Sequence, residues 1–251
     1  IAPVSRGRGV QCPQPAPLIF GLCAAPIALL HTSFPGYLTK QESIAVWGVD
    51  DLLIRSLLDK NQFHDPLDEA LNLGISSATW PLFGLVWPSA QKLADLMQTW
   101  DLKGKRVLEL GCGLALASLV VHRREGNVTA SDCHPLTETF LKANVLLNDL
   151  PPLHYETGNW GRVNKGLGAF DLLIASDVLY ERSHPAQLSG FIQEHAAEGA
   201  EVLIIDPNRG NRSAFHRDMA HMGFSVTEII MNEPLQDLST YRGRLLHYTR
   251  G

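Results

Sequence analysis

Two glycines and two carboxylates stand where a parallel sheet could gather them around one ligand. Gly111 and Gly113 follow the mostly apolar run 106–110, while Asp132 and Asp177 each follow a further run of this kind. Glycine lets a backbone approach a ligand without a clash from Cβ. A carboxylate at the end of the second strand can accept hydrogen bonds from both ribose hydroxyls. These residues therefore predict a pocket for an adenosine-bearing cofactor at the carboxyl ends of the strands.

The spacing of the glycines narrows the choice of cofactor. A dinucleotide fingerprint would have a third glycine at position 116, which is Leu116 here. Asp132 suits either cofactor, and it could also cap the helix expected near Pro135. The glycine spacing, with Asp-Val-Leu-Tyr at 177–180, favours S-adenosylmethionine and hence methyl transfer. An NAD(P)-dependent oxidoreductase is the alternative from another class, as is a module that binds the cofactor without turnover.

The elements that must position these residues alternate along the chain. Strands are predicted at 106–110, 127–131, 153–157, 170–176, 201–206, 224–231 and 240–248. Helices are predicted from Pro88 onward and at 115–124, 135–148, 185–195 and 212–222. A short hairpin is predicted within 44–54, and the last two strands, joined by a short turn, must be antiparallel. The expected fold class is α/β: a Rossmann-like, seven-stranded, mostly parallel sheet with helices on both faces and a C-terminal antiparallel hairpin.

Composition limits the partners and the compartment. The chain has 251 residues, 45% of them hydrophobic, and a net charge of -5 with no Lys/Arg-rich run, so nucleic acid is not an expected partner. The cysteines Cys12, Cys23, Cys112 and Cys133 show no metal-ligand spacing, so we expect reduced thiols and no metal. No apolar run approaches the ~20 residues that span a bilayer. We expect a cytoplasmic monomer.

Three regions are expected along the chain. Residues 1–40 are proline-rich and are interpreted as a flexible leader, with a targeting segment or an arm packed on the domain as alternatives. Residues 41–100 form an N-terminal extension and a helix that packs on the core, and residues 101–251 form the main domain. The segment 206–210, Asp-Pro-Asn-Arg-Gly, ends the fifth strand on the ligand face. A plain turn is the simpler interpretation, although Asn208 or Arg209 could touch a substrate.

Four short motifs carry a resemblance to a known family. They are GLVWPSA at 84–90, VLELGCGLA at 107–115, NW at 159–160 and DVLY at 177–180. With them the chain resembles the seven-β-strand (class I) protein lysine methyltransferases of methyltransferase family 16. That family includes the electron-transfer-flavoprotein β-subunit and calmodulin lysine methyltransferases.

The resemblance implies roles for further residues. Trp87 would border the cofactor, Trp160 would border its adenine, and Glu109 is the acidic residue that such enzymes carry before the first glycine. Asn159 departs from the family, since many members have an acidic residue there, but an amide oxygen can also accept from the adenine amine. The DVLY motif fits the D-x-x-Y signature, which lies beside the transferred methyl.

The implied activity is methylation of a lysine side chain on one dedicated protein partner. A lysine must lose its proton before it can attack, because the ammonium (pKa about 10.4 in model peptides) has no free lone pair. We expect Asp177 to position the cofactor or the amine, and Tyr180 to shape the channel and accept a hydrogen bond. A small-molecule N-methyltransferase on the same fold is the alternative, because the substrate face decides the acceptor.

Overall fold

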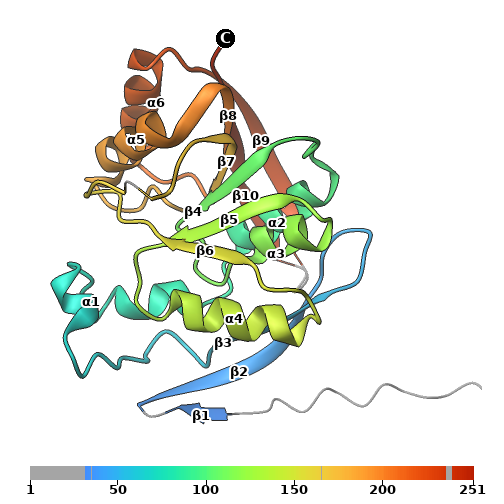
Figure 1. The fold of residues 1–251 in the computed structure, drawn as a ribbon, viewed down its shortest axis with the longest axis vertical. Coiled ribbons are helices and arrows are strands. Elements are labelled where there is room, and N and C mark those ends of the chain that lie inside the picture. Colours follow the sequence, from blue (N-terminus) through green and yellow to red (C-terminus); the bar gives the residue numbers. More distant parts are fainter. Residues whose placement is uncertain (1–31, 35, 165, 236–238) are drawn as a thin grey trace, which may run out of the picture.

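The computed structural model describes residues 32–34, 36–164, 166–235 and 239–251, and a seven-stranded sheet is at its centre (Figure 1). The strands lie in the order β6-β5-β4-β7-β8-β10-β9. Their bounds are β4 Arg106–Leu110, β5 Asn127–Asp132, β6 His154–Thr157, β7 Phe170–Ser176, β8 Ala196–Asp206, β9 Ser225–Pro234 and β10 Thr240–Thr249. The α/β class and the seven-stranded, mostly parallel sheet predicted from the sequence are confirmed.

The C-terminal hairpin enters the sheet in a way that the sequence does not predict. β4 to β8 pair in parallel, whereas β10 is antiparallel to both β8 and β9 and lies between them. After β8 and α6, the chain therefore forms β9 at the edge of the sheet and then returns as β10, which lies between β9 and β8. The predicted antiparallel pairing of the last two strands is confirmed. β8 is longer than predicted and begins at Ala196, with a register irregularity between Phe170 and Leu172 of its neighbour β7.

Helices cover both faces of the large sheet, as the alternation of the strand residues requires. The helices are α1 Glu69–Asn72, α2 Pro88–Thr99, α3 Leu116–Arg123, α4 Thr137–Leu147, α5 His184–His195 and α6 Arg212–His221, with a 3₁₀ turn η1 at Trp80–Gly84. In Figure 1, α5 and α6 lie on one side of the sheet and α2 and α3 on the other. Val107 of β4 joins the core under α2 and α3, and its neighbour Leu108 joins the core under α5 and α6.

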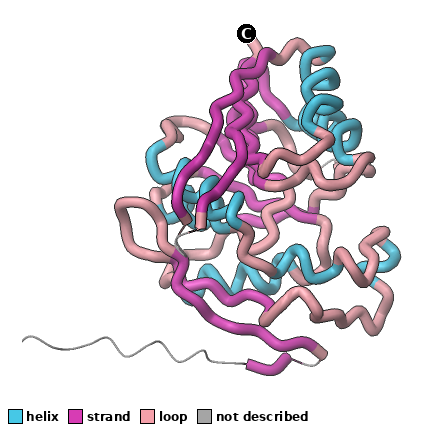
Figure 2. Tube along the Cα trace, turned by 180° about the vertical axis from the view of Figure 1, so that it is seen from behind, coloured by secondary structure: helices cyan, strands magenta, loops and turns pink. Residues whose placement is uncertain are grey.

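A second, three-stranded sheet contains the predicted hairpin. It consists of β1 Thr32–Phe34, β2 Tyr37–Ile44 and β3 Leu52–Leu57, all antiparallel. In Figure 2 the helix α4 lies between this small sheet and the large sheet. The leader interpreted for 1–40 lies mostly outside the described residues, but its last part is corrected, since residues 32–34 and 37–40 form strands. Between β3 and α2 the chain contains the short helix α1 and the 3₁₀ turn η1.

Two asparagines, one on α4 and one at its C-cap, hold the edge of β3 as a neighbouring strand would. Asn144 accepts from the backbone N–H of Arg55 (2.8 Å) and donates to its carbonyl (3.3 Å). Asn148, one turn later, makes the same pair of bonds with Leu53 at 2.9 and 2.8 Å. Because an amide side chain offers both a donor and an acceptor, it can replace the two backbone groups of a missing strand. The small sheet is therefore attached to the domain by directed hydrogen bonds as well as by apolar packing.

Replacing Asn144 with alanine is expected to lower the free energy of unfolding by about 2–3 kcal/mol, because Arg55 loses two partly buried backbone hydrogen bonds. Asn144 is 0% exposed. Asn148→Ala is the control: it removes the equivalent two bonds to Leu53, and a bond to the carbonyl of Asn144 (2.7 Å), from a more exposed site where water can replace them, so the loss should be smaller. Urea unfolding measures both, and equal losses would contradict this account.

Candidate functional site

The glycine turn after β4 adopts a left-handed backbone at alternate residues. Gly111 has φ +61°, Gly113 +51° and Ala115 +58°. A Cβ added to Gly113 would lie 2.8 Å from the carbonyl oxygen of Phe83 in η1. The glycine at this position is therefore required both by its dihedral angle and by the close approach of a second backbone segment. The turn from β4 into α3 is thus closely covered by η1, which leads to Trp87.

Asp132 ends β5 beside this turn, as predicted. One of its carboxylate oxygens accepts from the N–H of Gly113 (3.0 Å), and the other accepts from the N–H of His134 (2.9 Å). Burial raises the pKa of the Asp132 carboxyl above its ordinary value, although both N–H groups favour the charged form. Each oxygen keeps a further lone pair, so the carboxylate can still accept from the two hydroxyls of a ribose.

Glu109 lies beneath the turn, and its exposed fraction is only 1%. One carboxylate oxygen accepts from both the N–H (2.8 Å) and the hydroxyl (2.5 Å) of Ser118 in α3. The side chain thus holds the start of α3 against β4 and supports the turn from below. A direct contact between Glu109 and the cofactor stays a prediction. The burial of the Glu109 side chain and its bonds to Ser118 favour a supporting role instead.

The buried Glu109 is expected to make stability depend on pH. Burial raises the pKa of this carboxyl from 4.5 to about 7 despite its bonds to Ser118. The native state therefore holds a proton that the unfolded chain releases between these two values, so the stabilisation present below pH 4.5 is lost as the pH rises to about 7. The difference in unfolding free energy between the wild type and Glu109→Gln should fall by about 3 kcal/mol across this range. Parallel pH profiles from urea unfolding would contradict this account.

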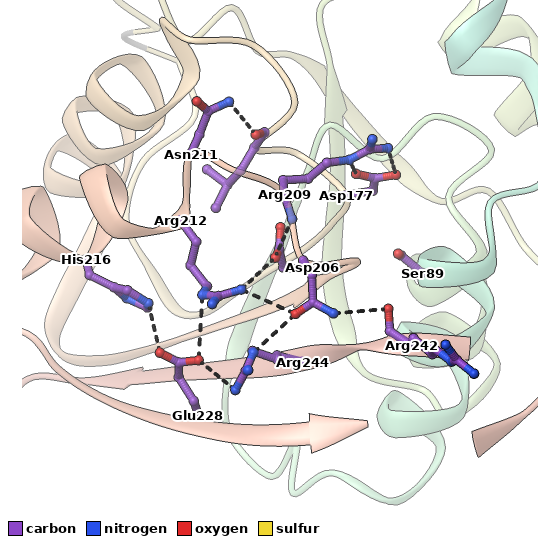
Figure 3. Close-up of polar contacts among 12 residues, drawn as sticks. Ser89, Asp177, Asp206, Arg209, Asn211, Arg212, His216, Glu228, Arg242 and Arg244 are labelled. Carbon is purple, nitrogen blue, oxygen red and sulfur yellow. Dashed lines mark hydrogen bonds and ion pairs between the residues drawn. The ribbon is translucent and has the colours of Figure 1, made fainter. Parts of the chain in front are cut away.

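Asp177 follows β7 directly and has a left-handed backbone, with φ +53°. Its N–H donates to the carbonyl of Ile205 (2.9 Å), which fixes the residue to β8. Its carboxylate forms a two-pronged ion pair with Arg209, with Nε–Oδ1 at 2.7 Å and Nη2–Oδ2 at 2.8 Å (Figure 3). A non-glycine residue in this conformation carries strain, which is common at functional sites. Its position at the end of β7 and its two-pronged ion pair distinguish Asp177 from the other residues with a left-handed backbone.

Aromatic rings connect the glycine turn with Tyr180. Trp160 packs against Gly111, where an added Cβ would lie 3.1 Å from the indole ring. Its ring meets His184 edge-on at 5.4 Å between centroids, and His184 meets Tyr180 in the same way at 4.5 Å. Tyr180 is 45% exposed. Desolvation nevertheless raises the pKa of Tyr180, so the residue presents a neutral phenol.

The side chains of Trp87 and Asn159 both form hydrogen bonds with backbone groups close to them in sequence. The indole N–H of Trp87 donates to the carbonyl of Leu82 (2.8 Å), and Trp87 lines a groove of about 650 Å³ between β2, β3 and the start of α2. Asn159 accepts from the N–H of Gly161 (2.9 Å) through its side-chain oxygen, which closes a turn beside Trp160. That oxygen retains a second lone pair, so acceptance from an adenine amine stays a prediction.

Some residues of the site are not identified by the motifs. Arg209, in a segment that the sequence predicts as a plain turn, pairs with Asp177, and Asn211 donates to the carbonyls of Leu179 (2.9 Å) and Glu181 (3.0 Å). The only sequence signal for them is their place after β8, at the carboxyl end of the sheet. Sequence gives no hint that the 206–211 loop and the DVLY segment are bonded together.

Within the described part of the chain, no three His, Cys, Asp or Glu side chains are grouped as metal ligands. In that same part, no helix combines the length and the apolar character needed to cross a membrane.

Comparison with known proteins places the chain among methyltransferases. The sequence model of a family described as lysine methyltransferase matches residues 69–221. Protein N-lysine methyltransferase METTL21A of Danio rerio is 33% identical over 181 residues, which cover 66% of this chain and 80% of that protein. The electron transfer flavoprotein beta subunit lysine methyltransferase of Xenopus laevis is 27% identical, covering 57% of this chain and 58% of its own. Calmodulin-lysine N-methyltransferase of Arabidopsis thaliana is 30% identical, covering 51% and 47%. The chain thus spans about half the length of the last two.

Solved structures agree on the fold. A methyltransferase from Pyrococcus furiosus has a TM-score of 0.54 and 20% identity, covering 73% of this chain and 98% of its own. The magnesium protoporphyrin IX methyltransferase of Synechocystis, solved with bound SAH, has a TM-score of 0.53 and 16% identity, covering 73% and 100%.

Proposed function

The chain belongs to the lysine methyltransferase family, and we propose that it transfers a methyl group from S-adenosylmethionine to a lysine side chain of a protein partner. One observation supports the assignment of the site above all. Asp132 and Asp177 stand at the carboxyl ends of β5 and β7, the two strands that flank β4 and its glycine turn. An adenosine group held at Asp132 could therefore reach across the turn toward Asp177.

The residues around the turn fit S-adenosylmethionine, which is the methyl donor of this family. Gly111 and Gly113 would let the cofactor approach the backbone, the carboxylate of Asp132 would accept from the ribose hydroxyls, and Trp160 would border the adenine. Trp87, which lies between η1 and α2, would also border the cofactor. When bound, the cofactor would supply a methyl group activated by a positively charged sulfur, and that sulfur would leave as a neutral thioether as the lysine nitrogen bonds to the methyl carbon.

The chain's own residues would then align the acceptor amine. Only the neutral amine can attack, so the lysine must release its proton to water before transfer. Asp177 would hold the amine in line, with its own position fixed by the ion pair to Arg209 and by the backbone bond to Ile205. Tyr180, a neutral phenol beside His184, would border the channel and accept a hydrogen bond from the amine.

The relatives favour a protein acceptor over a small molecule. Three of them are named as lysine methyltransferases that act on proteins: one on proteins in general terms, one on the electron transfer flavoprotein beta subunit and one on calmodulin. We place the reaction in the cytoplasm because S-adenosylmethionine is an intracellular metabolite. We further propose that the enzyme acts as a monomer.

Calorimetric titration of the purified chain with S-adenosylmethionine and, separately, with NAD is the first test. Micromolar binding of the first alone supports the proposed site. A radiolabelled-methyl reaction with cell lysate then tests the acceptor: label in protein that amino-acid analysis identifies as methyllysine supports the function. Binding without labelled protein, or label in small molecules only, would contradict a protein acceptor.

A further inference from the structure

The guanidinium of Arg209 uses only one of its two hydrogen-bonding edges in this structure. The side edge, Nε and Nη2, is occupied by Asp177 at 2.7 and 2.8 Å. A planar guanidinium has a second, end-on edge made by its two Nη groups, which can grip another carboxylate in the same two-pronged manner. Among the described residues no side chain hydrogen-bonds to that second edge, and the Arg209 side chain is 41% exposed.

The protein holds this arginine in place before any substrate arrives. The N–H of Arg209 donates to the buried carboxylate of Asp206 (3.0 Å). Two residues later, Asn211 ties the same loop to the carbonyls of Leu179 and Glu181, within and just after DVLY. The loop and the catalytic segment are therefore one hydrogen-bonded unit. Little side-chain entropy remains to be lost when the free edge binds an anion.

Two other carboxylates near this loop, Asp206 and Glu228, already have arginine partners. Asp206 pairs with Arg212 (3.5 Å), and Glu228 pairs with Arg212 (3.6 Å), Arg244 (3.3 Å) and His216 (3.1 Å), as Figure 3 shows. These carboxylates therefore do not compete for the outer edge of Arg209. The site presents an oriented cation at its surface, although the chain as a whole carries a net charge of -5.

We propose that the free edge of Arg209 binds a carboxylate of the substrate protein that lies next to the acceptor lysine. The inference rests on the proposed function and adds a preference for particular acceptor lysines. The lysine and its acidic neighbour would meet Asp177 and Arg209, so two opposite charges of the substrate would face two opposite charges of the enzyme. Arg209 is then a specificity-determining residue that selects lysines with an Asp or Glu beside them in sequence or in the folded surface.

Proteome labelling tests the preference directly. Lysate is treated with the full chain and S-adenosylmethionine, and the methylated lysines are mapped by mass spectrometry. We expect the modified sites to have Asp or Glu within a few residues or on the adjoining surface. Arg209→Gln should lower kcat/KM for these sites by about 10- to 100-fold, the effect of losing a charged hydrogen bond. Arg217→Gln, which removes an exposed arginine on α6, is the matched control and should change little.

A coupling measurement separates recognition from mere support of Asp177. In the main mapped substrate, the acidic neighbour is changed from Glu to Gln or from Asp to Asn. The wild type should lose about 10-fold in kcat/KM, while Arg209→Gln should lose less than about 2-fold, because its partner is already gone. Equal losses in both enzymes would overturn the proposal, as would methylated sites with no acidic neighbours.

Cofactor affinity distinguishes the other source of a carboxylate, the amino-acid end of S-adenosylmethionine. If that group occupied the free edge, Arg209→Gln would weaken cofactor binding in calorimetry and show no coupling to the substrate, which overturns the proposal. An unchanged cofactor Kd with coupling to the substrate supports it. A wild type that binds the cofactor but methylates no protein would instead be a failure of the proposed function.

Discussion

Replacement of Asp177 with asparagine or alanine is expected to lower kcat by about 100-fold or more while leaving the chain folded and able to bind the cofactor. Asparagine keeps the shape and tolerates the left-handed backbone (φ +53°), but it removes the charge that would hold the amine. Alanine removes both the charge and the hydrogen-bonding atoms. The Arg209 side chain left without its partner is 41% exposed, so water can solvate it and the fold should persist.

Asp149→Ala is the matched control for the backbone. Asp149 also has a left-handed backbone, at φ +52°, but it lies on an exposed loop after α4. Both alanine variants should lose about 1 kcal/mol of stability through strain, and only the variant at Asp177 should lose turnover. Single-turnover methyl transfer and urea unfolding measure the two effects. A kcat close to that of the wild type in Asp177→Asn would show that Asp177 does not act on the acceptor.

The central sheet could be predicted from the sequence because its strands carry strong local signals. Residues 170–176 are a largely apolar run, and residues 106–110 are apolar except for Arg106 and Glu109, as strands buried on both faces should be; both strands are found at those bounds. The pairing of β10 between β8 and β9 has no local signal. The short segment between the last two predicted strands fixes only that these strands are antiparallel, and the choice of neighbour depends on packing across the whole sheet.

The candidate site likewise contains some residues that the sequence predicts and others that only the folded structure identifies. Gly113 and Asp132 are recognisable because turn geometry and strand ends restrict residue type, and their direct hydrogen bond agrees with that interpretation. Glu109 fits a motif, but the motif does not tell whether the side chain points to the cofactor or to Ser118 beneath the turn. The partnership of Arg209 with Asp177 joins residues 32 apart in sequence, and only the folded sheet brings them together.

Gly113→Ala is expected to raise the Kd for S-adenosylmethionine by about 100-fold or more and to lower stability by about 2–4 kcal/mol. The added Cβ would lie 2.8 Å from the carbonyl oxygen of Phe83, which belongs to the backbone of η1 and cannot turn aside as a flexible side chain can. Relief of the clash must move either η1 or the turn itself. Because the N–H of Gly113 donates to Asp132, a shifted turn would also displace the carboxylate expected to hold the ribose.

Gly104→Ala separates this contact from backbone strain. Gly104 has a left-handed backbone with φ +73°, but an added Cβ would meet no atom within 4 Å. It should therefore lose about 1 kcal/mol of stability and keep its affinity for the cofactor. Calorimetric titration and urea unfolding of the two variants give the comparison. If both variants bind S-adenosylmethionine as the wild type does, the cofactor does not depend on the packing of η1 against this turn. Loss of affinity in Gly113→Ala alone would link the covering segment, and with it Trp87, to the binding of the cofactor.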